Sequence, residues 1–220
     1  MKKVAIVGNG DYAKMVFRYM SMEDEYEVKA FLVEKEYIRE MEIYGIEVLA
    51  VEEANLRLCI NDISLIMGIG YKQMGNIRKK LYEKLKKQGF VFGNYIHPTA
   101  VISKNVTLGE GNAIFEKVLL QESVVLGNCN ILFGNNMIGH ESKLGDFNLV
   151  AGSVTVAGCV TIGNNCFFGV SSTVRDHVVV EDYVLVGAAA YCGKNAEAYS
   201  VLAAPRAVLL EDKKSIDMNL

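Results

Sequence analysis

The sequence predicts a two-part fold: an α/β domain over residues 1–93, followed by a solenoid of short parallel β-strands over residues 94–220. Three observations support this fold class. The first part alternates apolar runs with helix-like segments. The second part repeats an apolar position every six residues, and glycine often follows that position. A change of repeat near residue 94 therefore predicts two domains.

The first 93 residues predict a small Rossmann-like domain. Short apolar runs rich in aliphatic residues indicate strands, whereas apolar residues spaced three or four apart indicate helices. The expected strands are residues 3–8, 27–34, 45–50 and 63–70, and the expected helices are residues 11–20 and 73–88. Strand and helix alternation with short connections is typical of a parallel sheet flanked by helices.

A glycine-rich turn joins the first expected strand to the first expected helix. The segment VGNGDYA supplies Gly8, Gly10 and Ala13 in a G-x-G-x-x-A pattern, and Glu34 ends the next strand. In this context the pattern indicates a nucleotide whose phosphate is bound by backbone N–H groups at the start of a helix. A dehydrogenase is the rival interpretation, but about 93 residues are too few for two mononucleotide-binding halves.

A second glycine pair, Gly68 and Gly70, ends the strand at residues 63–70. Its position at the carboxyl end of a parallel strand places it on the edge where such sheets bind ligands. The candidate substrate-binding residues of this domain are Gly8, Gly10, Asp11, Glu34 and Gly70.

From Ile96 to Val186 an aliphatic residue or phenylalanine stands at every sixth position, sixteen times without a break. Two residues before each of these positions, from Ala100 to Val184, the chain holds only Ala, Val, Asn, Ser or Cys. One large and one small inward residue per hexad fit a solenoid whose strands are separated by turns. The glycines that follow the large residue are expected at corners that favour a residue without Cβ.

This pattern resembles the hexapeptide-repeat acyltransferases. The resemblance implies a left-handed parallel β-helix with three hexads, eighteen residues, in each coil, and residues 96–187 then supply about five coils. Positions eighteen apart lie one above another, so the column through His140 continues to Gly158 and Asp176. His140 follows Gly139 directly, which places it on a corner with its side chain pointing outward.

An outward imidazole beneath a glycine suits acyl transfer from a thioester. An imidazole titrates close to neutral pH, so His140 is the expected general base for the attacking amine or hydroxyl. The Gly158 N–H is the expected donor to the carbonyl oxygen, an interaction worth roughly 3 kcal/mol. Glu141 is expected to orient the imidazole, provided that the corner bends the backbone. Asp176 and His177 form a rival pair two coils further on, without a glycine after their hexad's core residue.

The whole chain resembles the bacterial nucleotide-sugar N-acetyltransferases acting on 4-amino sugars, and their sialic acid O-acetyltransferase relatives. The residues that carry this likeness are the glycine loop, the HPTA segment that begins at His97, and the His140–Glu141 pair after a hexad glycine. His97 itself is expected to be structural. The resemblance implies acetyl-CoA as cosubstrate, a UDP- or dTDP-linked amino sugar as substrate, no metal, and a homotrimer with acetyl-CoA between adjacent β-helices. A role in surface polysaccharide biosynthesis follows from the same likeness.

The candidate residues for binding acetyl-CoA are Gly158, Ala188, Lys194 and Arg206. The segment APRAV at residues 204–208, which contains Arg206, departs from the family's usual ending, with Ala where the family commonly has Gly. Two other functions stay open, namely O-acetylation of a sialic acid or another sugar hydroxyl, and non-catalytic binding of a nucleotide sugar.

Composition points to a small-molecule partner. The chain has 23 basic and 26 acidic side chains, and this net charge near −3 gives no electrostatic basis for binding nucleic acid or an anionic membrane. No apolar run approaches the roughly 20 residues of a membrane helix, and no signal-peptide core is present, so a cytoplasmic protein is expected. The five cysteines form no CxxC pair and are expected to be buried thiols.

Overall fold

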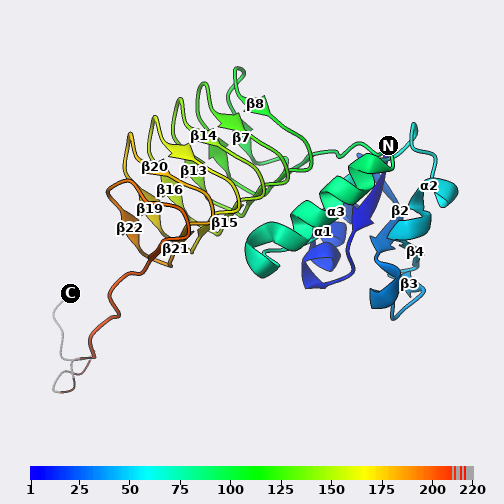
Figure 1. Cartoon of the computed structure of the whole chain (residues 1–220), viewed down its shortest axis with the longest axis horizontal. Helices are drawn as coiled ribbons and strands as arrows, with labels where there is room; N and C mark the ends of the chain where they lie inside the picture. The colour runs from blue at the N-terminus through cyan, green and yellow to red at the C-terminus, as the bar shows by residue number, and fades with distance from the viewer. Residues whose placement is uncertain (210, 212–213, 215, 217–220) are drawn as a thin grey trace.

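The computed structural model describes residues 1–209, 211, 214 and 216, and it consists of an α/β domain followed by a solenoid of parallel strands (Figure 1). This architecture confirms the predicted fold class, with the coils of the solenoid stacked one after another away from the α/β domain. Within the described residues, no helix is both long and apolar enough to cross a membrane.

The α/β domain is built around one five-stranded sheet. Its elements are β1 (Lys2–Val7), α1 (Asp11–Ser21), β2 (Tyr26–Val33), η1 (Lys35–Tyr37), β3 (Glu42–Ile43), β4 (Ile46–Ala50), η2 (Val51–Glu53), α2 (Ala54–Arg57), β5 (Ser64–Met67), η3 (Lys72–Gly75) and α3 (Asn76–Lys87). The strand order is β3-β4-β2-β1-β5, and every pair is parallel except β3–β4. The order reverses beside β1, because β2 and β4 extend the sheet on one side of β1 and β5 pairs on the other.

Two features of this domain differ from the expected pattern. The short strand β3 forms a hairpin with β4 through Tyr44 and Gly45, which both have positive φ, at 53° and 78°. The helix expected at 73–88 begins later, because Gln73 and Met74 have φ of 53° and 50° and do not continue an α-helix. Gly75, the N-cap of α3, has φ of 80° and lies against the solenoid, where a Cβ would be 2.8 Å from the Phe147 carbonyl oxygen.

The solenoid consists of two-residue strands that pair with the strand eighteen residues away, except that β23 pairs with β21 sixteen residues away. For example, Ile138 pairs with Val156, and Leu144 pairs with Ile162. The strands are β6 (Tyr95–Ile96), β7 (Val101–Ile102), β8 (Thr107–Leu108), β9 (Ala113–Ile114), β10 (Leu119–Leu120), β11 (Val125–Leu126), β12 (Ile131–Leu132), β13 (Met137–Ile138), β14 (Lys143–Leu144), β15 (Leu149–Val150), β16 (Thr155–Val156), β17 (Thr161–Ile162), β18 (Phe167–Phe168), β19 (Thr173–Val174), β20 (Val179–Val180), β21 (Leu185–Val186), β22 (Tyr191–Cys192) and β23 (Val201–Leu202).

Three sheets form the three sides of the solenoid. The β13 sheet contains β7, β10, β13, β16, β19 and β22, and the β14 sheet contains β8, β11, β14, β17 and β20. The β15 sheet contains β6, β9, β12, β15, β18, β21 and β23. The chain passes through the sheets in this order in each coil, so three columns of corners run along the molecule, the β13–β14, β14–β15 and β15–β13 corners.

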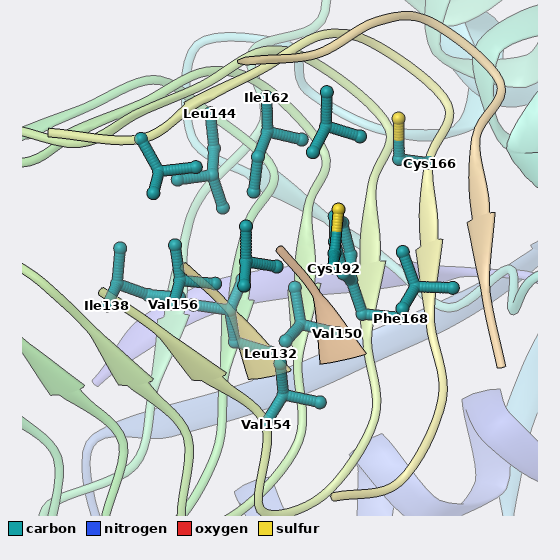
Figure 2. Packing of buried hydrophobic residues seen from close by; sticks show 14 of the residues in the cluster. Leu132, Ile138, Leu144, Val150, Val154, Val156, Ile162, Cys166, Phe168 and Cys192 are labelled. Carbon is teal, nitrogen blue, oxygen red and sulfur yellow. The ribbon is translucent and has the colours of Figure 1, made fainter. Parts of the chain in front are cut away.

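The core of the solenoid is formed by the two inward positions of each hexad. Figure 2 shows Leu132, Ile138, Leu144 and Val150 pointing into one shared interior. The positions two residues earlier are also buried, including asparagines and serines that the pattern placed there. The buried asparagines and Ser142 are hydrogen-bonded, as burial of a polar group requires, whereas Ser172 Oγ has no hydrogen-bond partner among the described residues. Asn148, for example, donates to the Gly163 carbonyl oxygen at 3.0 Å.

The corners show that the hexad glycines serve a purpose other than a left-handed turn. From Leu108 to Val186, the residue three positions after each large inward residue has positive φ, and among these residues are Ser123, Glu141, Cys159 and His177. Gly139 has no such φ, but a Cβ there would lie 2.6 Å from the Gly158 nitrogen of the next coil. The prediction that these positions require a residue without Cβ therefore holds, and the reason is close stacking between coils.

The α/β domain packs against the outer face of the β15 sheet. Ala113, Ile131 and Leu149 point outward from this sheet and are buried in a cluster with residues of β1, β2 and α1. Tyr19 of α1 donates a hydrogen bond to Glu116, and Tyr82 of α3 donates one to Glu110 at 2.6 Å. The two corners that flank the β15 sheet therefore carry the contacts between the two parts.

The expectation of five buried thiols is wrong for two cysteines. Cys129, Cys166 and Cys192 are buried in the solenoid, but Cys59 is exposed and Cys159 is half-buried. Cys159 lies on a corner, where the side chain points away from the core.

Candidate active site

His140 lies on the β13–β14 corner, the column of corners opposite the β15 sheet and its covering domain. Two hydrogen bonds fix its backbone, because its N–H donates to Gln121 Oε1 at 3.0 Å and its carbonyl accepts from the Cys159 N–H at 2.8 Å. The side chain is 59% exposed in the single chain. The solenoid thus holds the backbone rigidly and leaves the imidazole accessible.

The imidazole of His140 lies directly against Gly158 of the next coil. A Cβ on Gly158 would come within 2.5 Å of His140 Nε2, 2.7 Å of Cε1 and 3.0 Å of Cδ2. The Gly158 N–H donates no hydrogen bond to any described residue, whereas the neighbouring Ala157 and Cys159 N–H groups both do. The structure therefore brings together the predicted base and an unpaired backbone donor.

Glu141 has φ of 58°, and this left-handed conformation bends the corner in the way that its predicted role needs. Its Oε2 lies 3.8 Å from His140 Nδ1, an ion-pair distance that is too long for a hydrogen bond. The Cys159 thiol donates to the same Oε2 at 3.2 Å, and this hydrogen bond raises the pKa of Cys159. Cys159 had no predicted role, although its place above Glu141 follows from the eighteen-residue register.

The rival pair, Asp176 and His177, has a similar separation. His177 Nε2 lies 3.9 Å from Asp176 Oδ2, and both side chains are largely exposed. What distinguishes His140 is its contact with Gly158, which has no counterpart described for His177. The remaining histidine, His97, accepts a hydrogen bond from the Thr99 N–H at 3.2 Å and packs edge-on against Tyr19 at the start of the solenoid, as a structural residue would.

The candidate residues for binding acetyl-CoA lie in different places. Lys194 follows β22 as His140 follows β13, which places it further along the same column of corners. Ala188 lies on the β15–β13 corner, and Arg206 lies beyond β23 and is exposed. Of these four candidates, Gly158 is the one that contacts His140 in the described chain, so the others are not gathered around the imidazole within one copy.

The glycine loop of the α/β domain lies at the carboxyl end of β1, where the strand order reverses. Gly8 has φ of 112°, and a Cβ there would meet Gly68 O at 3.0 Å. Gly10 caps α1 with an extended backbone and with open space around its Cα, and the exposed Asp11 begins the helix. Gly70 follows β5 on the neighbouring strand end. These positions form one edge, at the place where parallel sheets of this kind bind ligands.

The Glu34 carboxylate is engaged by lysines of α3. Its Oε1 lies 3.4 Å from Lys80 Nζ and 3.7 Å from Lys84 Nζ, and its side chain is only 12% exposed. A ribose hydroxyl would therefore compete with two cations for this carboxylate.

Arg78 is the residue of this region that the sequence interpretation missed. Its side chain is fully buried, and it donates to Gly70 O at 3.0 Å and to Phe147 O at 2.5 Å. Burial lowers the pKa of Arg78 to about 10, which still leaves the guanidinium charged at neutral pH. Arg78 therefore connects the glycine loop after β5 to a corner of the solenoid. Its position on α3, among lysines that face solvent, gave no sign of this role.

The glycine loop and His140 do not meet within one chain. The α/β domain covers the β15 sheet, whereas His140 lies on the corner between the other two sheets.

Comparison with known proteins agrees with both halves of the structure. Residues 3–85 match the PglD N-terminal domain family. The chain is 34% identical over 116 residues to UDP-N-acetylbacillosamine N-acetyltransferase of Bacillus subtilis, an alignment that covers 52% of this chain and 51% of that relative. The matched region thus spans about half the length of this curated relative.

Solved structures match almost the whole chain. A variant of perosamine N-acetyltransferase from Caulobacter crescentus with a histidine replaced by asparagine, in complex with CoA and GDP-perosamine, superposes with a TM-score of 0.80. It is 28% identical, and the match covers 90% of this chain and 92% of that one. The acetyltransferase domain of PglB from Neisseria gonorrhoeae has the same fold, with a TM-score of 0.80, 22% identity and coverage of 91% and 96%. The resemblance seen in the sequence is therefore confirmed as a likeness to these acetyltransferases, and the two-part fold is shared with them.

Proposed function

We propose that this chain, as a member of the hexapeptide-repeat nucleotide-sugar acetyltransferases, transfers an acetyl group from acetyl-CoA to the amine of a nucleotide-linked 4-amino-deoxy sugar. The premise is the shared architecture, a PglD-type α/β domain followed by a β-helix. The relatives are named for the same reaction on UDP-linked and GDP-linked amino sugars.

One observation carries the proposal, which is the contact between the His140 imidazole and Gly158. Acyl transfer needs a base for the nucleophile and a donor for the carbonyl oxygen, and the two must lie within reach of one reacting carbon. His140 Nε2 and the Gly158 N–H supply both functions on adjacent coils. The residues present therefore fit a thioester whose carbonyl oxygen points at the Gly158 nitrogen.

The chain's own groups perform three tasks in this reaction. Acetyl-CoA supplies the acetyl group as an activated thioester. His140 takes a proton from the attacking amine and returns a proton to the departing sulfur as the carbon–sulfur bond breaks. The Gly158 N–H stabilises the negative charge that develops on the carbonyl oxygen. Glu141 favours the His140 tautomer that carries the proton on Nδ1. The distance of 3.8 Å between His140 Nδ1 and Glu141 Oε2 has to shorten when the site is occupied.

The complete site needs more than one copy of the chain. We place the nucleotide on the loop of Gly8, Gly10 and Gly70, where helix N–H groups are available to a diphosphate. Because this loop and His140 are on different sides of one chain, a neighbouring copy in a trimer would complete the site. The proposal also includes the cytoplasmic location and the role in surface polysaccharide synthesis.

The test is a screen of UDP-, dTDP- and GDP-linked 4-amino sugars with acetyl-CoA, read as release of free thiol. The wild-type chain should acetylate an amine in this panel, and His140→Asn should lower kcat by about 100-fold or more with little change in thermal stability. His177→Asn is the matched control and should keep most of the activity. Acetylation of the matching sugar hydroxyls alone would favour O-acetyl transfer. Binding of the nucleotide sugar without any acetyl transfer would contradict an enzymatic function.

A further inference from the structure

Three side chains of different chemistry meet at the β13–β14 corner. His140, Glu141 and Cys159 each present one ligand atom, and these three atoms all lie within 4.8 Å of one another. The Glu141 Oε2 is central, at 3.2 Å from Cys159 Sγ and 3.8 Å from His140 Nδ1. We call this group the His140–Glu141–Cys159 cluster.

The backbone of the solenoid fixes the spacing of this cluster. Glu141 and Cys159 lie on successive coils at the same corner position, with φ of 58° and 59°. The Glu141 N–H donates to the Glu122 carbonyl at 2.9 Å, and the Cys159 N–H donates to the His140 carbonyl at 2.8 Å. The backbone positions of the three residues are therefore set by regular structure and not by a loop.

Two of the three separations lie close to those around a tetrahedral zinc ion, and the third lies within 4.8 Å. Zinc–sulfur bonds near 2.3 Å and zinc–nitrogen or zinc–oxygen bonds near 2.0 Å place neighbouring ligand atoms about 3.5 Å apart. The measured separations of 3.2 Å and 3.8 Å lie on either side of this value. The His140 and Glu141 side chains are 59% and 66% exposed, so solvent can reach a fourth coordination position.

We propose that the His140–Glu141–Cys159 cluster binds a thiophilic divalent cation, with Zn²⁺ as the representative ion, and that the bound ion inhibits the chain. The thiol, the imidazole and the carboxylate are the ligand types that zinc takes in proteins. Binding replaces the thiol proton with the metal, so one proton is released to solvent for each ion bound. The ion then occupies His140 Nδ1 and Glu141, the two groups that orient the imidazole for proton transfer. The inhibition rests on the proposed function, whereas the binding does not.

Direct metal binding is measured on the full chain without any substrate. Co²⁺ serves as the spectroscopic probe, because a thiolate ligand gives it a charge-transfer band, and Zn²⁺ displaces it in a titration. The wild type should show the band and bind about one ion per chain. Cys159→Ser should lose the band and weaken Zn²⁺ binding by about tenfold or more, since loss of a supporting group alone costs 10- to 100-fold. Glu141→Gln should also weaken binding.

The matched control is Cys59→Ser, because Cys59 is exposed and lies in the α/β domain, far from the cluster in sequence. This variant should bind Co²⁺ and Zn²⁺ like the wild type. The proposal is overturned if the band is absent from the wild type, if it persists in Cys159→Ser, or if Cys59→Ser removes it.

Inhibition is measured separately, with each variant compared with its own activity without metal. Zn²⁺ should inhibit the wild type and Cys59→Ser at similar concentrations, and inhibition of Cys159→Ser should require about ten times more metal. If metal binds at the cluster but the chain transfers no acetyl group, the proposed function fails and the binding site stands. If the chain is active but Cys159→Ser is equally sensitive to Zn²⁺, the inhibitory role of the cluster is wrong.

Discussion

Replacing Gly158 with alanine tests the contact on which the proposed chemistry depends. The new methyl group would lie 2.5 Å from His140 Nε2, 2.7 Å from Cε1 and 3.0 Å from Cδ2. Nonbonded carbon atoms settle at about 3.5–4.0 Å, so the imidazole has to move away by about 1 Å. Gly158 does not have a positive φ, which means that alanine fits the backbone itself.

The expected effect is large on catalysis and small on stability. A displacement of about 1 Å at a reacting group costs on the order of 100-fold in rate, or about 2.7 kcal/mol of transition-state stabilisation. The exposed imidazole can move without opening a cavity, so the free energy of unfolding should change by less than about 1 kcal/mol. The loss should appear in kcat, because no group that binds the nucleotide is altered.

The assay compares Gly158→Ala with Gly152→Ala in acetyl transfer and in thermal unfolding. A Cβ on Gly152 would meet only the Gly134 carbonyl oxygen, at an ordinary 3.6 Å, so this variant is a matched control in the same solenoid. Gly152→Ala should keep kcat within about twofold. Full activity in Gly158→Ala would refute the reasoning, because the imidazole would then work from some other position.

Three further predictions concern the glycine loop and the contacts between the two parts. Gly10→Glu should raise KM for the nucleotide sugar about tenfold or more, because its carboxylate repels the diphosphate, and KM for acetyl-CoA should not change. Gly10→Ala is the control and should behave like the wild type, because nothing lies within 4 Å of the added Cβ. Burial alone would raise the pKa of Glu110, but hydrogen bonds from Lys86, Tyr82 and the Phe92 N–H lower this pKa below 4.5. The ionised Glu110 therefore contributes its full stabilisation above pH 4.5, and this stabilisation is lost as the pH falls through the lowered pKa. Glu110→Gln should thus reduce the free energy of unfolding by about 1 kcal/mol at pH 7, and its difference from the wild type should narrow in urea titrations below pH 4.5. Arg78→Met should cost about 3 kcal/mol or more in urea unfolding, since it leaves buried carbonyl oxygens unpaired, whereas Arg57→Met breaks only an exposed ion pair with Glu47 and should cost less than about 1 kcal/mol.

The six-residue register is sufficient to predict most of the solenoid. Each hexad consists of a two-residue strand and a four-residue corner, so the register decides which side chains point inward. Ile138 and Gly158 could therefore be placed from the sequence. The register continues one step beyond Val186 to Cys192 in β22, and it then shifts, because Ala196 pairs with Val180 in place of a further strand. No change in residue type marked that shift.

The contacts between the two parts were harder to predict, because they join residues far apart in sequence. Arg78 binds a carbonyl oxygen sixty-nine residues away, and nothing local distinguishes it from the exposed lysines of the same helix. One signal was present, however. The outward positions Ala113, Ile131, Leu149 and Phe167 are apolar on the β15 sheet, whereas the β14 sheet carries Lys143 at the corresponding position. An apolar column on one side of a solenoid indicates a covered face.

The residues of the candidate site also fall into two groups, those that the register could place and those that depend on contacts between distant elements. The stacking of His140 beneath Gly158 follows from the register, and the left-handed conformation of Glu141 follows from its corner. The engagement of Glu34 by Lys80 and Lys84 does not, because it depends on how α3 packs beside β2. The hydrogen bond from the Cys159 thiol to Glu141 was not predicted, because the register places the two residues one above the other but does not give the direction of their side chains.

The most direct test of the proposed shared site is complementation between two inactive chains. His140→Asn lacks the base, and Gly10→Glu binds the nucleotide sugar weakly, so at nucleotide-sugar concentrations below the wild-type KM neither alone should exceed about a tenth of the wild-type activity. If each site combines His140 of one copy with the loop of another, unfolding and refolding the two chains together should restore activity at about a quarter of the sites in randomly mixed trimers. A mixture that assembles but stays inactive would contradict a site completed by a neighbouring copy.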